Sequence, residues 1–171
     1  EICESLKVDP KTVLFSGVNK TLSDIEHAMD AGVIRFTAES PLHIRLLEQA
    51  AAARDAIYPV VLRLTAGTQF GMDESDLLWA IENRASYPHL HFEGIHYFSG
   101  TQRAKLDKDQ RRELVMLGEF MDKLERDYGF VCEKIEYGPG LFFPYFTHED
   151  HSDTLAPIRE LAPDLQKLAE R

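Results

Sequence analysis

Short apolar runs alternate with longer amphipathic stretches along the chain. The apolar runs are rich in β-branched and aromatic residues, which are typical of β-strands. The stretches between them repeat apolar residues at three- and four-residue intervals, which predicts helices. The predicted strands are residues 13–18, 34–39, 59–64, 92–99 and 133–137, and the predicted helices are residues 21–31, 41–53, 74–84, 107–128 and 154–171. Strands and helices in alternation favour a parallel α/β sheet.

The predicted helices carry recognisable end signals. Thr21 or Ser23 is expected to cap the helix at 21–31, and Gly32 is expected to end it. Ser40 and Pro41 are expected to be the N-cap and the first residue of the next helix, because proline needs no N–H partner there. The helix at 74–84 is expected to turn four apolar side chains inward, which are Leu77, Leu78, Trp79 and Ile81.

The number of strand–helix units limits the architecture. Five predicted units cannot close a (β/α)₈ barrel, which needs eight units and about 250 residues. The chain is therefore either an open doubly wound sheet or an internal piece of a barrel whose first and last strands lie outside it. The chain begins at Glu1 without a Met, and residues 1–6 already look helical. These two features favour a piece of a longer protein.

The composition is that of one globular domain with an acidic surface. The 171 residues include 19 Lys and Arg and 29 Asp and Glu, so the formal net charge is −10, and 44% of residues are hydrophobic. This charge disfavours binding to nucleic acid. No apolar run reaches the ~20 residues that span a bilayer, and no signal peptide is recognised, so no membrane partner is expected. Cys3 and Cys132 form no CxxC pair, and we expect a reducing, cytoplasmic setting.

Two predicted strand ends look like anion sites. Residues 99–102 offer two hydroxyls and a glycine, and residues 138–140, with the sequence Gly-Pro-Gly, expose backbone amides without side chains in the way. Because functional groups gather at the carboxyl ends of parallel strands, a phosphate would suit both segments. The alternative is that Gly-Pro-Gly is only a tight turn. Neither a Walker A motif nor a GxGxxG fingerprint is present.

Arg63 and His96 are the other candidates at strand ends. Arg63 lies on a mostly buried strand and therefore needs an anionic partner, which is either Glu39 on the neighbouring strand or a ligand. His96 and the aromatic residues after it can form the wall of a ring-binding pocket, although a packed barrel mouth would also use them. The two histidines of residues 148–151 do not have HExxH spacing, and this segment is expected to be a solvated loop rather than a metal site.

Taken together, five segments resemble the fold-type III pyridoxal-phosphate enzymes, in particular the diaminopimelate, ornithine and arginine decarboxylase group. The matching segments, in the family's order and spacing, are residues 15–20, 39–40, 62–64 together with 69–72, 94–102 and 137–141. Residues 94–102 are similar to the family's Gly-x-His-x-His-x-Gly-Ser-Gln segment, and residues 137–141 are similar to its triple-glycine phosphate loop. The resemblance implies a (β/α)₈ TIM barrel of the alanine racemase kind, of which residues 1–171 are a single-domain fragment carrying about strands three to seven.

The resemblance assigns pyridoxal 5'-phosphate as the cofactor and six residues to its binding. Thr101 replaces the family serine that holds the phosphate, and Phe98 stands where the family usually stacks a histidine on the pyridine ring. Pro139 replaces the central glycine of the phosphate loop and removes one N–H donor. The implied cofactor-binding residues are Arg63, His96, Phe98, Thr101, Gly138 and Gly140.

No catalytic residue is assigned within the chain. In the family, the Schiff-base lysine lies on the first barrel strand, the carboxylate that contacts the pyridine nitrogen lies on the last strand, and substrate-binding residues lie in a C-terminal β domain. The resemblance places all three outside residues 1–171, and Lys20 matches a different family position. The chain alone is therefore expected to be inactive.

The resemblance implies that the parent protein is a cytoplasmic, homodimeric amino-acid decarboxylase, a carbon–carbon lyase whose substrate the sequence does not identify. One alternative is an amino-acid racemase or a non-catalytic cofactor-binding protein on the same barrel. Another alternative is a cofactor-free α/β binding domain in which the glycine turns are only turns. No metal is expected in any of these proteins.

Overall fold

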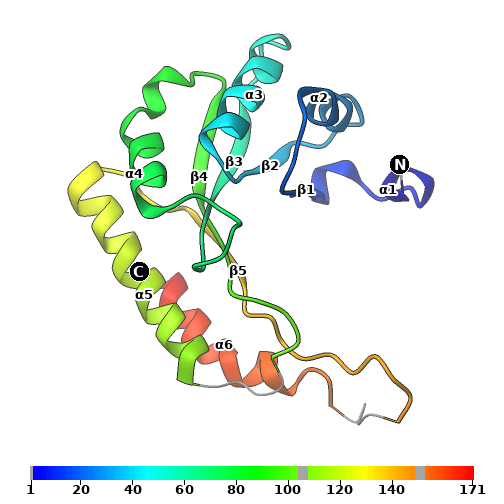
Figure 1. Cartoon of the computed structure of the whole chain (residues 1–171), viewed down its shortest axis with the longest axis vertical. Helices are drawn as coiled ribbons and strands as arrows, with labels where there is room; N and C mark the ends of the chain where they lie inside the picture. The colour runs from blue at the N-terminus through cyan, green and yellow to red at the C-terminus, as the bar shows by residue number, and fades with distance from the viewer. Residues whose placement is uncertain (1, 104–107, 149–152) are drawn as a thin grey trace. The chain divides into compact units, whose positions relative to one another are not determined.

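The computed structural model describes residues 2–103, 108–148 and 153–171. They form two compact units (Figure 1). Unit 1 contains Glu1–Tyr97 and Cys132–Glu136, and unit 2 contains Phe98–Val131 and Tyr137–Arg171. Within the described ranges, every helix is too short or too polar to span a membrane.

The strands form one sheet in the order β1-β2-β3-β4-β5. Their bounds are Leu14–Phe15 (β1), Arg35–Ala38 (β2), Tyr58–Leu64 (β3), Leu90–Phe98 (β4) and Lys134–Gly138 (β5). The pairs β1–β2, β2–β3 and β3–β4 are parallel, and β5 is the neighbour of β4. The predicted parallel sheet with consecutive strands is confirmed. β1 is shorter than predicted because the amide of Ser16 donates to the carbonyl of Leu14, which turns the chain away from the sheet.

Unit 1 begins with a short helix, and each of its three longer helices follows a strand, as predicted. They are α1 (Ile2–Ser5), α2 (Leu22–Asp30), α3 (Pro41–Ala52) and α4 (Glu74–Glu82), with short 3₁₀ turns at Pro10–Thr12 and Arg84–Ser86. Thr21, rather than Ser23, caps α2 through a capping box with Asp24. Ser40 caps α3 by accepting a hydrogen bond from the amide of His43.

The core of unit 1 lies between the sheet and these helices. Fully buried side chains come from the strands and from one face of each longer helix, and they include Ile25, Phe36, Ile44, Leu47, Leu62, Leu77, Ile81 and Ile95. Each such side chain stabilises the fold by about 1.5–3 kcal/mol. The prediction that Trp79 turns inward is wrong, because its side chain is 46% exposed. At 100° per residue, Trp79 lies about 200° around the helix from Leu77, whereas Ile81 shares the face of Leu77.

Backbone approaches closely between β4 and β5 at Gly94. A Cβ added to Gly94 would strike the carbonyl oxygen of Lys134 and come within 2.9 Å of the sulfur of Cys132. The register of β3 against β4 also shifts at this point, between Val60 and Val61. Only glycine therefore fits here, because the neighbouring strand leaves no room for a Cβ, and no turn is involved.

Unit 2 contains the two longest helices, α5 (Lys108–Tyr128) and α6 (Ala156–Ala169). They contact each other, and their buried residues include Leu114, Leu117, Leu124, Leu161 and Leu168. The three- and four-residue spacing on α5 predicts this buried face. The predicted start of α5 at Asp107 lies outside the described residues.

Candidate functional site

The predicted site residues fall into two groups, one in each unit, which are described separately. In unit 1, Lys20, Glu39, Arg63 and His96 form what we call the buried polar cluster. In unit 2, residues 98–103 and 137–143 form what we call the glycine loops. Arg63 and His96 belong to the first group, and Phe98, Thr101, Gly138 and Gly140 belong to the second.

The buried polar cluster lies at the carboxyl ends of successive strands. Lys20 and Glu39 follow β1 and β2, and Arg63 and His96 lie near the ends of β3 and β4, where they are register partners. Their exposed fractions are 5%, 6%, 8% and 8%, respectively. Parallel strands place their carboxyl ends at one edge of the sheet, so the sequence positions four polar side chains at that edge.

The sequence predicts either Glu39 or a ligand as the partner of Arg63, and the structure places Glu39 beside Arg63. Nη1 of Arg63 lies 3.0 Å from Oε1 of Glu39. The pair is close but not aligned as a hydrogen bond, and no described residue forms a hydrogen bond with Oε1 of Glu39 or Nδ1 of His96. A buried polar atom without a hydrogen-bond partner costs about 1–3 kcal/mol, so Nδ1 of His96 marks a place where an additional polar group is accommodated.

Burial and charge together set the protonation of the cluster. Burial, opposed by the charge of Glu39 and reinforced by that of Arg63, lowers the pKa of Lys20 to about 8. Burial also lowers the pKa of His96 to about 4, with contributions from the charges of Arg63 and Lys20. His96 is therefore neutral at pH 7. The cluster holds two formal cations and one carboxylate, and this excess of positive charge suits an anionic group.

An aromatic loop covers Arg63 on one side. The loop between β3 and α4 returns to the strand, since the amide of Met72 donates to the carbonyl of Arg63 at 2.8 Å. The guanidinium carbon of Arg63 lies 5.6 Å from the centre of the Phe70 ring, a cation–π arrangement. Gly71 permits this return, because a Cβ there would lie 2.9 Å from the amide nitrogen of Thr65.

Sequence reasoning did not identify Lys20 and His43 as part of this environment. Lys20 is almost fully buried, and its ammonium group donates to the carbonyl of Gly17. His43, on α3, is 5% exposed, and its Nδ1 accepts from the amide of Glu39 at 3.4 Å. Burial and the charge of Lys20 lower the pKa of His43 to about 4. The sequence signal for Lys20 is its position directly after a strand.

In unit 2, hydrogen bonds join the two glycine loops into a short ladder. The amide of Ser99 donates to the carbonyl of Gly138 at 3.0 Å, and the amide of Arg103 donates to that of Gly140 at 2.7 Å. The side-chain amide of Gln102 bonds both backbone groups of Phe143, at 2.9 and 2.8 Å. The two segments are 39 residues apart in sequence, and these bonds fix their relative position.

Thr101 and Gly140 lie next to each other at the centre of this ladder. A Cβ added to Gly140, whose φ is +65°, would strike the carbonyl oxygen of Gly100 and lie 2.9 Å from the amide nitrogen of Thr101. Thr101 and residues 138–140 are thus close enough for one phosphate, as predicted. No described residue accepts a hydrogen bond from the amide of Thr101, which leaves this donor for an anion.

Phe98 packs directly on Gly138. A Cβ on Gly138 would come within 2.6 Å of the Phe98 ring, which is 36% exposed. Glycine at this position therefore allows the aromatic ring to approach the backbone of the loop closely. The predicted stacking of Phe98 on a cofactor ring, like the cofactor roles of the other five residues, stays a prediction.

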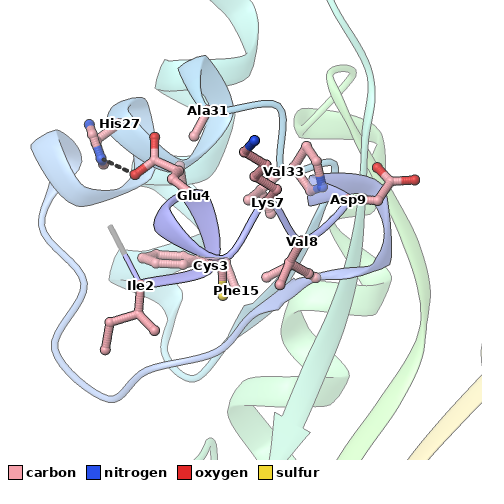
Figure 2. A pocket seen from close by; sticks show the side chains of 13 residues that line it. Ile2, Cys3, Glu4, Lys7, Val8, Asp9, Phe15, His27, Ala31 and Val33 are labelled. Carbon is pink, nitrogen blue, oxygen red and sulfur yellow. Dashed lines mark ion pairs between the residues drawn. The ribbon is translucent and has the colours of Figure 1, made fainter.

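The histidine segment shows no metal site in the described residues. The His148 ring stacks on Phe146 at a centroid distance of 5.7 Å, and Glu149 to His151 lie outside the described residues. An apolar pocket of about 710 Å³ lies elsewhere in unit 1, between the N-terminal segment, α2 and β1. Figure 2 shows it, with the ion pair of Glu4 and His27 at its rim. None of the predicted site residues lines it.

Comparison with known families gives one match over the full length. Residues 1–171 match the family described as pyridoxal-dependent decarboxylase, pyridoxal binding domain. The match covers both the buried polar cluster and the glycine loops.

Curated relatives are decarboxylases. The chain is 31% identical over 159 residues to L-glutamyl-[BtrI acyl-carrier protein] decarboxylase of Niallia circulans, covering 84% of this chain and 36% of that protein. It is 29% identical over 153 residues to diaminopimelate decarboxylase of Zymomonas mobilis, covering 81% of this chain and 36% of that protein. The chain therefore spans little more than a third of the length of these relatives.

Solved structures show the same fold. Diaminopimelate decarboxylase from M. jannaschii in complex with L-lysine superimposes with a TM-score of 0.82 at 19% identity, covering 99% of this chain and 42% of that chain. Lysine decarboxylase from Selenomonas ruminantium gives a TM-score of 0.78 at 22% identity, covering 98% of this chain and 42% of that chain. The five-stranded parallel sheet thus has the same fold as a part of the barrel in these structures.

Proposed function

We propose that the protein containing this chain decarboxylates an amino acid, starting from the fact that the chain belongs to the pyridoxal-dependent decarboxylases as their pyridoxal binding domain. The match over residues 1–171 carries this proposal. The cofactor of the family is pyridoxal phosphate. When bound, this group withdraws the electrons released as the α-carboxylate leaves as CO₂.

The glycine loops fit the phosphate of this cofactor. The amide of Thr101, which donates to no residue in the described part of the chain, the turn at Gly140 and the close approach of the two loops suit a phosphate. Backbone amides in a glycine-rich turn bind anions without side-chain interference. In this proposal, the Thr101 hydroxyl adds one charge-assisted hydrogen bond. The loss of a donor at Pro139 leaves Gly138 and Gly140 to supply the amides of the second loop.

The remaining predicted residues serve the ring of the cofactor in this proposal. Phe98 offers a flat apolar surface against which an aromatic ring can stack. His96, neutral at pH 7 because of its lowered pKa, offers a hydrogen-bonding nitrogen without adding charge. Arg63 supplies positive charge that Glu39 holds in place. These roles position and polarise the cofactor, whereas the covalent lysine of the family is not assigned within the chain.

The proposal extends to substrate and setting. Relatives act on diaminopimelate and on a glutamyl group attached to an acyl-carrier protein, and both are amino-acid substrates. We propose an amino-acid substrate for this protein as well, acting in the cytoplasm and as a homodimer. The two free cysteines support a reducing setting. We also propose that residues 1–171 alone do not catalyse the reaction.

The proposal is tested on the full-length protein with added pyridoxal phosphate. Visible absorbance of the bound cofactor and CO₂ release from a panel of amino acids are the expected results. Interconversion of L and D isomers without CO₂ release would replace the decarboxylase with a racemase. If the full-length protein neither binds the cofactor nor releases CO₂, the proposal is wrong. Residues 1–171 alone, assayed in parallel, should release no CO₂.

A further inference from the structure

A closed ring of side chains links the two glycine loops to helix α5. Oη of Tyr137 donates to Oε2 of Glu113 at 2.5 Å, and Nη1 of Arg103 donates to Oε1 of the same carboxylate at 2.9 Å. Arg103 also donates to Oγ of Ser99 at 3.0 Å, and Ser99 donates to the carbonyl of Gly138 at 3.3 Å. We call these four side chains, Ser99, Arg103, Glu113 and Tyr137, the loop clamp.

Glu113 is the centre of the loop clamp. Its two carboxylate oxygens each accept from a different loop, one through Arg103 and the other through Tyr137. The side chains of Arg103 and Glu113 are only 20% and 17% exposed, so water competes little for these charge-assisted bonds. Burial raises the pKa of Tyr137, and its hydrogen bond to Glu113 raises it further, so Tyr137 stays a neutral donor.

A second contact from α5 holds the same loops independently of Glu113. Gln110, one helical turn earlier, is fully buried, and its Nε2 donates to the carbonyl of Pro139 at 2.9 Å. Gln110 and Glu113 are three residues apart and so lie on the same face of the helix. Helix α5 therefore contacts Pro139, the central residue of Gly138–Gly140, through Gln110. It contacts both loops through Glu113.

This arrangement meets a physical need of a glycine-rich anion site. Glycine backbones have many accessible conformations, so amides in such loops converge on one anion only if other contacts fix them beforehand. Arg103 neutralises Glu113, which means that the loop clamp fixes the loops without placing a net negative charge beside an anion. A carboxylate so close to an anion site would otherwise weaken binding.

We propose that Glu113 is a positioning residue for the phosphate of the cofactor, acting through the loop clamp on the amides of both glycine loops. This inference rests on the proposed function, since it needs the glycine loops to bind the cofactor phosphate. It assigns a binding role to a helix residue that acts through Arg103 and Tyr137. Its consequence is that loss of the Glu113 charge weakens the binding of the phosphate but not of the pyridine ring.

The test compares two ligands that differ only in the phosphate, pyridoxal 5'-phosphate and pyridoxal. Their dissociation constants are measured by absorbance titration of the cofactor-free, full-length protein. Glu113→Gln keeps the shape of the side chain but removes the charge that accepts hydrogen bonds from Arg103 and Tyr137. It should raise the dissociation constant of pyridoxal phosphate about tenfold. Pyridoxal should bind as in the wild type. The matched control is Glu119→Gln on the same helix, which is exposed and should change neither constant.

Tyr137→Phe gives a second, milder variant. It removes one donor to Glu113 but leaves the ion pair of Glu113 with Arg103. It should therefore raise the dissociation constant of pyridoxal phosphate by a smaller factor and leave that of pyridoxal unchanged. It decides the question if Glu113→Gln does not fold. Equal weakening of both ligands, or no change in either, would overturn the positioning role.

The wild-type protein separates this failure from failure of the proposed function. If it binds pyridoxal phosphate more tightly than pyridoxal and Glu113→Gln does not alter the ratio, only the role of Glu113 is wrong. If the wild type binds neither ligand, the proposed function and the inference fall together.

Discussion

The buried polar cluster of unit 1 and the glycine loops of unit 2 are both rich in polar groups at strand ends, but they are built from different parts of the chain. The cluster consists of charged side chains that lie in the interior with few exposed atoms. The loops consist of backbone amides and carbonyls, with glycines where a Cβ would collide. In the cluster, replacing a side chain changes the local charge. In the loops, an added side-chain atom collides with the neighbouring backbone or ring.

The difference has an energetic cause. A buried ion pair is costly to form and still more costly to break, because one partner is then left with an uncompensated charge in a medium of low polarity. A backbone anion site carries no net charge and is limited by geometry instead. Mutations should therefore affect the stability of unit 1 and the ligand affinity of unit 2, and four predictions test this division.

The largest expected effect is the loss of the carboxylate from the cluster. Glu39→Gln removes the carboxylate charge beside the buried Lys20 and Arg63, and it should lower the free energy of unfolding of the full-length protein by about 3–5 kcal/mol. Urea denaturation measures this change. The control is Asp127→Asn, which breaks the exposed pair with Arg126 and should have no measurable effect. Equal stability of both variants would mean that the ion pair of Arg63 and Glu39 is not significant for the fold.

The next effect is the addition of one methyl group to the glycine loops. Gly140→Ala places a Cβ against Gly100 at a positive φ, which combines backbone strain with overlap and should cost about 2–4 kcal/mol of cofactor affinity or stability. Gly129→Ala is the matched control, since its φ is +57° but nothing lies within 4 Å of an added Cβ. Gly129→Ala should lose a little stability and no affinity for pyridoxal phosphate. If the two variants behave alike, strain rather than contact between the loops explains the result.

A single hydroxyl gives a smaller effect. Thr101→Val removes one hydrogen bond to the phosphate and should weaken pyridoxal phosphate binding by about 1.5–3 kcal/mol, roughly 10- to 100-fold. Thr101→Ser keeps the hydroxyl and should restore most of the affinity. Equilibrium titration of the full-length variants measures both values. An unchanged dissociation constant in Thr101→Val would exclude this side chain from the site.

The smallest effect is the dependence of stability on pH in unit 1. The pKa values of His43 and His96 are lowered to about 4 in the folded protein, against about 6.5 in the unfolded chain. The unfolded chain therefore binds more protons between pH 6.5 and 4, so the free energy of unfolding should fall as the pH decreases through this window. Between pH 7 and pH 6 the fall should be on the order of 1–2 kcal/mol.

Urea denaturation at several pH values measures that slope. The double variant His43→Asn, His96→Asn should show a shallower decline than wild type. His148→Asn, which changes an exposed histidine in the other unit, should keep the wild-type slope. A slope that is the same in all three proteins would assign the acid sensitivity to other groups.

Much of the fold could be read from the sequence because it depends on neighbouring residues. Five strands, the longer helices and the caps at Thr21 and Ser40 follow from short-range spacing and from side chains that bond the adjacent backbone. The order of the strands follows from the short connections between them. The glycine segments can also be predicted from the sequence, because a glycine determines the conformations open to its own backbone. The exposure of Trp79 also follows from local geometry, because the helical angle places Trp79 opposite the buried Leu77.

The tertiary structure alone decided which distant side chains meet. The sequence offered Arg63 two partners, and only the packing of β2 against β3 selected Glu39. The sequence places Lys20 after a strand, but it does not indicate that Lys20 and His43 are buried, because burial depends on what covers a side chain. Glu113 and Gln110 look like ordinary polar positions on an amphipathic helix. Their contacts with residues 24 and 29 positions further along the chain arise from helix docking, which local spacing does not encode.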